Sequence, residues 1–155
     1  MKIKIENIMC PVDFSNCSDH ALEYAVALAQ AYQAKLLLLH VVMPPVTSLP
    51  GDPMIPEFVQ NLKELENACS ERIEEKIGPI RELGIDVQSC VVNGTPFAEI
   101  IRVAREEQSD IIVLGTHGRS GLQHLLIGSV AERVVRKAPC PVLTVKDPEH
   151  EFVMP

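Results

Sequence analysis

The order of apolar and amphipathic segments predicts a doubly wound α/β fold, in which helices cover both faces of one parallel sheet. Five short apolar runs alternate with four longer amphipathic segments along the 155 residues. Parallel strands need crossover helices of this kind, and right-handed crossovers place helices on both faces. A content of 46% hydrophobic and 23% charged residues is typical of a globular protein with its own core. We expect one domain over residues 1–146 and a tail at residues 147–155.

The first third of the chain predicts two buried strands joined by a helix. Residues 3–12 alternate and then become apolar, which predicts a strand that runs into full burial. The next helix has a broad face of small apolar residues suited to close packing on a sheet. Its N-cap is one of Ser15, Asn16 or Ser18. Residues 35–42 contain four consecutive leucines and predict a central strand.

A proline-rich segment and a long helix follow. Residues 43–56 contain five of the twelve prolines, so we expect a long loop, either mobile or acting as a lid over a ligand. Residues 57–83 then show apolar positions at helical spacing, with many Glu and Lys residues between them. Gly78-Pro79 is expected to end or kink this helix.

The remaining elements complete the alternation. Residues 85–92 alternate clearly and predict an edge or half-exposed strand. Thr95 is expected to cap a helix that begins at Pro96 and extends to about residue 107. Further strands are predicted at residues 110–114 and 141–145, separated by a glycine-containing loop and a helix from Ser129 to Lys137.

The loop before that last helix has the features of a phosphate cradle. Gly115, Gly118 and Gly128 punctuate it, and glycine lets a backbone approach a ligand closely. The helix N-terminus that follows offers unpaired N–H groups with partial positive charge, so an anion is the natural ligand. A structural alternative is a capping box, with Ser129 as N-cap and Glu132 reaching back. A capping box needs at most one of the three glycines, which favours the cradle.

Known nucleotide-binding loops of other kinds are absent. None of the eight glycines precedes a lysine, which excludes a Gly-Lys-Ser/Thr P-loop, and the chain contains no G-x-G-x-x-G pattern. The spacing instead resembles the universal stress protein family, whose nucleotide-binding members carry G-x2-G-x9-G-[S/T]. Four residues fill this pattern: Gly115, Gly118, Gly128 and Ser129.

The resemblance extends over nearly the whole chain. It includes Pro11-Val12-Asp13, Leu39-His40-Val41-Val42, Gly94-Thr95-Pro96 and the run from Ala138 to Leu143. It implies a Rossmann-like fold of the adenine nucleotide alpha hydrolase type, with strand order 3-2-1-4-5. That order creates a topological switch between the first and fourth strands, where ligands bind in sheets of this kind.

The expected site residues lie at this switch. Asp13 follows the first strand directly and could accept a hydrogen bond from a ribose hydroxyl or a nucleobase amine; capping the next helix is the alternative. The resemblance implies that Asp13 lines the pocket with Pro11 and Val12, and that the Val41 backbone contacts adenine. Phosphate is expected to meet N–H groups of Gly115, Gly118, Gly128, Ser129 and Val130. Arg119 could pair with phosphate, or be a solvated loop cation.

The candidates for catalysis or metal binding are weaker. His117 and His124 have no clustered carboxylates at ligand spacing, which argues against a transition-metal site made by the protein. Mg²⁺ arriving with the nucleotide, held mainly by phosphates and water, is more plausible. The chain has no G-x-S-x-G elbow and no lysine at the loop to stabilise a transferring phosphoryl group. Binding is therefore better supported than turnover.

Charge and cysteine content limit the partners and the compartment. A net charge of −7 with 4% aromatic residues argues against a general surface for nucleic acid or anionic membranes. The N-terminus does not read as a signal peptide, and no 18-residue apolar stretch exists. Five cysteines without a C-x-x-C fit a reducing cytoplasm. We expect Cys10, Cys90 and Cys140 to be buried small hydrophobic residues.

Three functions follow from these observations. The resemblance implies a regulatory stress-response protein that binds ATP or another adenine nucleotide, with at most slow hydrolysis or autophosphorylation and a regulatory protein as a further partner. It also implies a homodimer, paired through the terminal strand Pro141 to Val145. The alternatives are a true nucleotide hydrolase or phosphotransferase, and a dimeric interaction module in which nucleotide is irrelevant.

Overall fold

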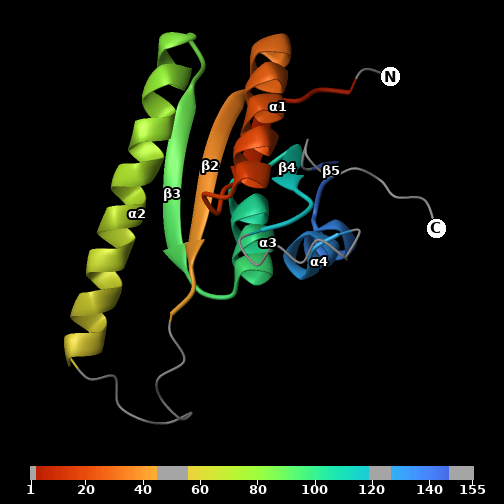
Figure 1. Ribbon diagram of the computed structural model, residues 1–155. Helices are drawn as coiled ribbons and strands as arrows, with labels where there is room; N and C mark the ends of the chain where they lie inside the picture. Colours follow the sequence, from red (N-terminus) through yellow and green to blue (C-terminus); the bar gives the residue numbers. More distant parts are fainter. Residues whose placement is uncertain (1–2, 45–55, 119–126, 147–155) are drawn as a thin grey trace.

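The protein folds as a five-stranded parallel sheet with helices on both faces (Figure 1). The computed structural model describes residues 3–44, 56–118 and 127–146. The elements are β1 (Asn7–Pro11), α1 (Asn16–Tyr32), β2 (Lys35–Val42), α2 (Pro56–Glu82), β3 (Val87–Asn93), α3 (Pro96–Glu106), β4 (Ile111–Gly115), α4 (Ser129–Lys137) and β5 (Val142–Val145). The strand order is β3-β2-β1-β4-β5, which confirms the predicted fold class and topology.

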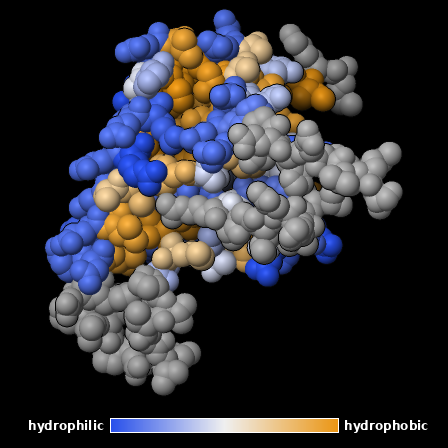
Figure 2. All heavy atoms as spheres, in the orientation of Figure 1, coloured by the Kyte–Doolittle hydropathy of each residue, from blue (hydrophilic) through white to orange (hydrophobic). Residues whose placement is uncertain are grey.

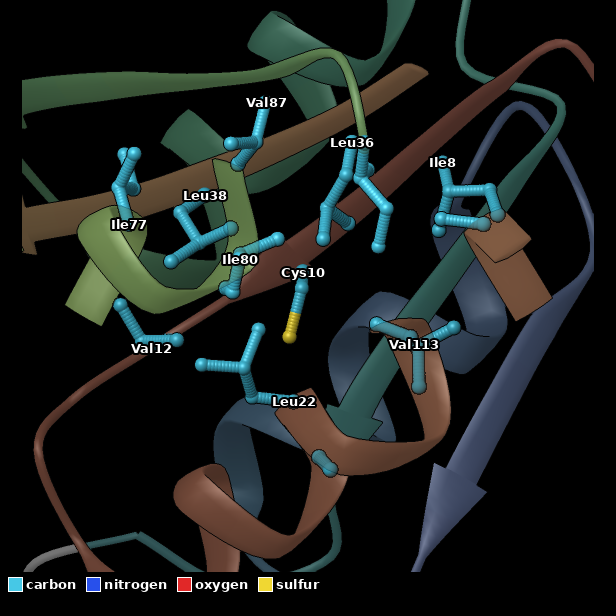
Figure 3. Close-up of a cluster of buried hydrophobic side chains, with 14 of the residues drawn as sticks. Ile8, Cys10, Val12, Leu22, Leu36, Leu38, Ile77, Ile80, Val87 and Val113 are labelled. Carbon is cyan, nitrogen blue, oxygen red and sulfur yellow. The ribbon is translucent and has the colours of Figure 1, made fainter. Parts of the chain in front are cut away.

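Two apolar layers flank the sheet because successive strand residues point to opposite faces. Ile8 and Cys10 pack with α1 and α2, where Leu22, Ile77 and Ile80 fill the same cluster (Figure 3). Met9 points the other way and packs with α3 and α4. Burial on both faces explains why the central strands read as continuous apolar runs rather than as alternating ones.

How deeply each cysteine is buried depends on its position in the sheet. Cys10 is fully buried, as predicted, because it lies in the central strand. Cys90 and Cys140 are only partly buried, so the prediction of full burial was wrong for them. Cys90 lies in the outer strand β3, and Cys140 lies in the turn before β5.

The long helix α2 matches the predicted residues 57–83 to within one residue and does not end at Gly78-Pro79. Pro79 lies inside the helix, which continues to Glu82. Ile77 and Ile80, on either side of Gly78-Pro79, are both buried against the sheet, so packing outweighs the cost of the proline. Gly78 also lacks the Cβ that would clash with the ring of a following proline.

The direction in which successive strands are added to the sheet reverses at β1, and this switch defines where a site can form. The chain moves outward from β1 through β2 to β3, then returns to the other side of β1 for β4 and β5. The carboxyl ends of β1 and β4 therefore carry connections that lead in opposite directions, the arrangement in which α/β sheets bind ligands. No described helix is long and apolar enough to cross a membrane.

Some predictions fall largely or wholly outside the described residues. The loop expected at residues 43–56 is described only at Met43, Pro44 and Pro56, and the expected tail at residues 147–155 is not described. Arg119 and His124 also lie outside the described ranges.

Candidate functional site

A pocket of about 470 Å³ opens at the carboxyl ends of β1, β2 and β4. Its volume lies within the range of small-molecule sites. The structure brings together around it every predicted site residue that it describes: Pro11, Val12, Asp13, Val41, Gly115, Gly118, Gly128, Ser129 and Val130. Residues more than a hundred positions apart thus share one cavity because the parallel strands end at the same edge of the sheet.

Asp13 occupies the turn between β1 and α1, and Ser15 holds its carboxylate. Asp13 Oδ1 accepts hydrogen bonds from the Ser15 amide, at 3.0 Å, and from the Ser15 hydroxyl. Ser15 is the N-cap of α1, since its side chain accepts a hydrogen bond from the Ser18 amide. The alternative that Asp13 is the N-cap was therefore wrong, while the cap predicted at Ser15, Asn16 or Ser18 is at Ser15.

The glycines at this edge are required by close approach within the protein. A Cβ atom at Gly115 would lie 2.7 Å from Cys17 Sγ, and one at Gly118 would lie 2.6 Å from Asp13 Oδ2. The Gly128 amide donates to the Thr116 carbonyl at 2.6 Å, so its predicted contact with phosphate would have to share or replace this hydrogen bond. Gly118 is the glycine that brings the loop against Asp13.

The N-terminus of α4 supplies the anion-binding element. Gly128 is its N-cap, and the first helical hydrogen bond runs from the Glu132 amide to the Gly128 carbonyl. The amides of Ser129, Val130 and Ala131 therefore lie in the first turn and have no acceptor within the helix. The capping box was wrong, because helix α4 begins at Ser129 without a side-chain cap and the Glu132 carboxylate pairs with Arg136. Amides that lack an acceptor within the helix, together with the helix dipole, favour an anion here.

Comparison with known proteins assigns the chain to one family. The model of the universal stress protein family matches residues 4–146. The chain belongs to the universal stress protein family. A universal stress protein of Methanocaldococcus jannaschii is 33% identical over 147 residues, which cover 94% of this chain and 85% of the relative.

Solved structures share the architecture. Universal stress protein UspA from Lactobacillus plantarum superposes with a TM-score of 0.82 at 26% identity, covering 93% of this chain and 99% of that one. A universal stress protein in complex with cAMP has a TM-score of 0.60 at 24% identity, covering 91% and 97% of the two chains.

His40 belongs to the site of this universal stress protein, although no role was predicted for it. Its side chain is buried and lines the pocket, and Nδ1 lies 2.7 Å from the Val12 carbonyl oxygen. Because a carbonyl only accepts, Nδ1 carries the proton and donates to Val12. The signal in the sequence was a polar side chain inside the apolar run of residues 35–42.

An apolar wall on the α2 side was also missed. Leu65 and Cys69 from α2, with Met43 at the end of β2, line the pocket. Met43 is 66% exposed and Leu65 is 45% exposed, so this wall reaches the surface. Figure 2 shows hydrophobic side chains gathered near the N-terminal half of α2. Spacing in α2 could not reveal these contacts, because they depend on how far the helix extends beyond the strands.

The opposite side of the pocket is polar. Thr116 and His117 line it, and Thr116 Oγ1 lies 3.0 Å from His117 Nδ1. Among the described residues, no group of three or more His, Cys, Asp or Glu side chains could hold a metal ion. The cavity thus combines apolar walls with a carboxylate and a helix N-terminus, a composition suited to a ligand that has both an aromatic base and an anionic group.

Proposed function

We propose that this universal stress protein binds ATP or another adenine nucleotide in the pocket at the carboxyl edge of the sheet. The observation that carries the proposal is the convergence of the Asp13 carboxylate and the N-terminus of α4 on one cavity. A carboxylate accepts from a ribose hydroxyl or a base amine, whereas free helix amides bind phosphate. Val41 lines the cavity and is proposed to contact adenine through its backbone. The complex with cAMP indicates that this fold can hold an adenine nucleotide.

Mg²⁺ is proposed to arrive with the nucleotide and to be held mainly by phosphate oxygens and water. Asp13 is an acidic side chain of the pocket lining that could contact such a hydrated ion. Arg119 is proposed to pair with phosphate. The described lining contains no lysine, so we propose at most slow hydrolysis, or autophosphorylation, and a regulatory role for binding.

The regulatory unit is proposed to be a homodimer paired through residues 141–145. β5 pairs with β4 along one side and stands at the end of the strand order. An edge strand presents unpaired backbone groups, and Leu143 adds an apolar side chain that is 36% exposed. Pairing of two β5 strands would satisfy these groups, and the bound nucleotide is proposed to bias the conformation that a regulatory protein partner recognises.

Thermal unfolding with ATP, ADP, AMP, cAMP and GTP, each with Mg²⁺, tests the binding proposal. A ligand at 100 times its dissociation constant stabilises the folded state by about 2.7 kcal/mol, which is several degrees for a domain of this size. We expect adenine nucleotides to raise the unfolding temperature. The proposal fails if the folded protein, freed of any copurified nucleotide, shows no shift with any of them.

Two variants at the first residue of α4 identify the cradle. Ser129→Pro removes both the amide N–H and the hydroxyl, yet proline suits the first helical position. Gly128 before it has φ −70° and ψ 155°, a conformation that a following proline favours. Ser129→Ala, which removes the hydroxyl alone, is the matched control. We expect the nucleotide-induced shift to fall moderately in Ser129→Ala and further in Ser129→Pro, whereas equal shifts in all three proteins would place the phosphate elsewhere.

A further inference from the structure

We propose that Phe14 and Arg72 are positioning residues that hold Asp13 in its ligand-binding orientation. The inference rests on the proposed nucleotide site and deepens it by naming what fixes its carboxylate. Neither residue is among those that line the described pocket. Any effect that they have on the ligand through contacts with the described lining must therefore pass through the turn that carries Asp13 or through His40.

Phe14 follows Asp13 directly and has an unusual backbone. Its φ is 64°, in the left-handed region that bulky residues rarely adopt, so surrounding contacts must hold it there. The His40 ring lies with its centroid 4.5 Å from that of Phe14. The Arg72 guanidinium lies over the Phe14 ring, 4.0 Å from its centroid. The Phe14 ring thus contacts both β2, through His40, and α2, through Arg72.

The residue on the other side of Asp13 is fixed as well. Val12 donates its amide to the Leu39 carbonyl at 2.8 Å and accepts at its own carbonyl from His40 Nδ1 at 2.7 Å. Both neighbours of Asp13 are therefore anchored to β2, and His40 takes part in both anchors. The carboxylate that results has Oδ1 on the Ser15 amide and Oδ2 facing Gly118.

Arg72 connects the turn that carries Asp13 to α2, although Arg72 lies nearly sixty residues after Phe14 in the sequence. One turn further along the helix, Lys76 Nζ pairs with Asp19 Oδ1 at 2.7 Å. Both cations bind α2 to the segment that follows β1, but only Arg72 contacts the Phe14 ring. Lys76→Ala is therefore a matched control for Arg72→Ala. It removes the same charge from the same helix but leaves the contacts of the Phe14 ring with His40 and Arg72 in place.

Calorimetric titration with ATP and with inorganic tripolyphosphate separates positioning from general damage. Tripolyphosphate engages the anion site and makes no use of an acceptor for ribose or base. We expect Arg72→Ala to weaken ATP binding by about two- to fivefold, the factor that corresponds to one exposed cation–π contact, and to leave tripolyphosphate binding unchanged. Arg72→Lys, which keeps a cation over the ring, should recover most of the loss, and Lys76→Ala should leave the ratio of the two affinities as in the parent protein.

Amide hydrogen exchange in the ligand-free protein gives a second readout. The Ser15 amide donates to Asp13 Oδ1, so its protection reports how firmly the carboxylate is held. We expect faster exchange of this amide in Arg72→Ala and in Phe14→Leu, and the parent rate in Lys76→Ala.

The two readouts distinguish the proposals. A parent protein that binds neither ATP nor any other nucleotide would overturn the proposed function. The exchange rate of the Ser15 amide would still decide whether Phe14 and Arg72 position Asp13. Unchanged Ser15 exchange in Arg72→Ala and Phe14→Leu would overturn the positioning role. So would an unchanged ratio of ATP to tripolyphosphate affinity in a parent protein that binds both.

Discussion

Cys10 shows how burial in the central strand changes the chemistry of one side chain. Its thiol is completely enclosed, and this burial, with a smaller contribution from the charge of Asp19, raises the pKa of Cys10 from 9.0 to about 12. A thiolate in that position would lose its hydration without gaining a partner. Cys10 therefore remains a neutral apolar residue wherever the protein is folded near neutral pH.

This pKa predicts a loss of stability at alkaline pH. The thiol of the unfolded chain ionises near pH 9, whereas the folded thiol stays protonated until about pH 12, so the stability it contributes is intact below pH 9 and declines above it. Between pH 8 and pH 10 the decline should be about 1 kcal/mol for this residue. Urea unfolding of the parent protein and of Cys10→Ala at both pH values measures it. Equal declines in the two proteins would contradict the prediction.

Gly115 shows what the spacing of glycines in the sequence can and cannot predict. The glycine spacing correctly pointed to the loop at the carboxyl edge, because the positions form one motif. The spacing could not say what each glycine meets: Gly115 admits the Cys17 side chain, and Gly128 closes the loop on Thr116. Two of the three glycines thus serve packing and closure, which depend on residues distant in the sequence.

At the scale of elements, Asp110 joins the two halves of the sheet. Its Oδ2 accepts from the amides of Glu6 and Asn7, at 2.8 and 2.9 Å, and its own amide donates to the Asn7 carbonyl. The ladder that follows between β1 and β4 pairs Ile8 with Ile111 and Met9 with Ile112. Because this central ladder is short, the carboxylate at its start is a substantial part of the joint.

Replacing Asp110 should therefore weaken the whole fold. Asp110→Ala leaves two backbone amides without their acceptor, and we expect a loss of about 1–2 kcal/mol in the free energy of unfolding. Asp110→Asn retains an oxygen acceptor and should lose less. Urea unfolding at neutral pH compares them. If Asp110→Ala unfolds at the same urea concentration as the parent protein, the carboxylate does not support the joint.

The elements were predictable where a local pattern determined them. The apolar runs that became β2 and β4, and Pro96 at the start of α3, each needed information from a few neighbouring residues. The effect of Gly78-Pro79 on α2 was less predictable, because packing of the helix on a distant sheet decided that it continues. For the same reason the place of Leu65 in the pocket lining was not predicted, because it depends on how α2 packs against the sheet.

At the scale of the whole molecule, the edge strand β5 predicts the oligomeric state. Light scattering at micromolar concentration should show a homodimer. The carbonyls of Pro141 and Val145 accept from amides in or just after β4, and residues alternate along a strand, so the Thr144 amide faces the free edge. Thr144→Pro removes this donor and should weaken the dimer. Leu143→Lys should weaken it by placing like charges across the two-fold axis. Tyr24→Lys, exposed on α1, is the control for added surface charge. A monomeric parent protein would refute pairing through β5.

The direction of the strands also has a practical consequence for how the protein is handled. All five strands are parallel, so β5 ends at the edge where the pocket opens, and the Val145 carbonyl accepts from the amide of Thr116 in the pocket wall. β1 begins at Asn7, on the opposite edge. A fusion partner attached directly after β5 would emerge beside the pocket and obstruct a ligand, whereas one attached before β1 would emerge at the opposite edge. Binding measurements should therefore use a label at the amino terminus.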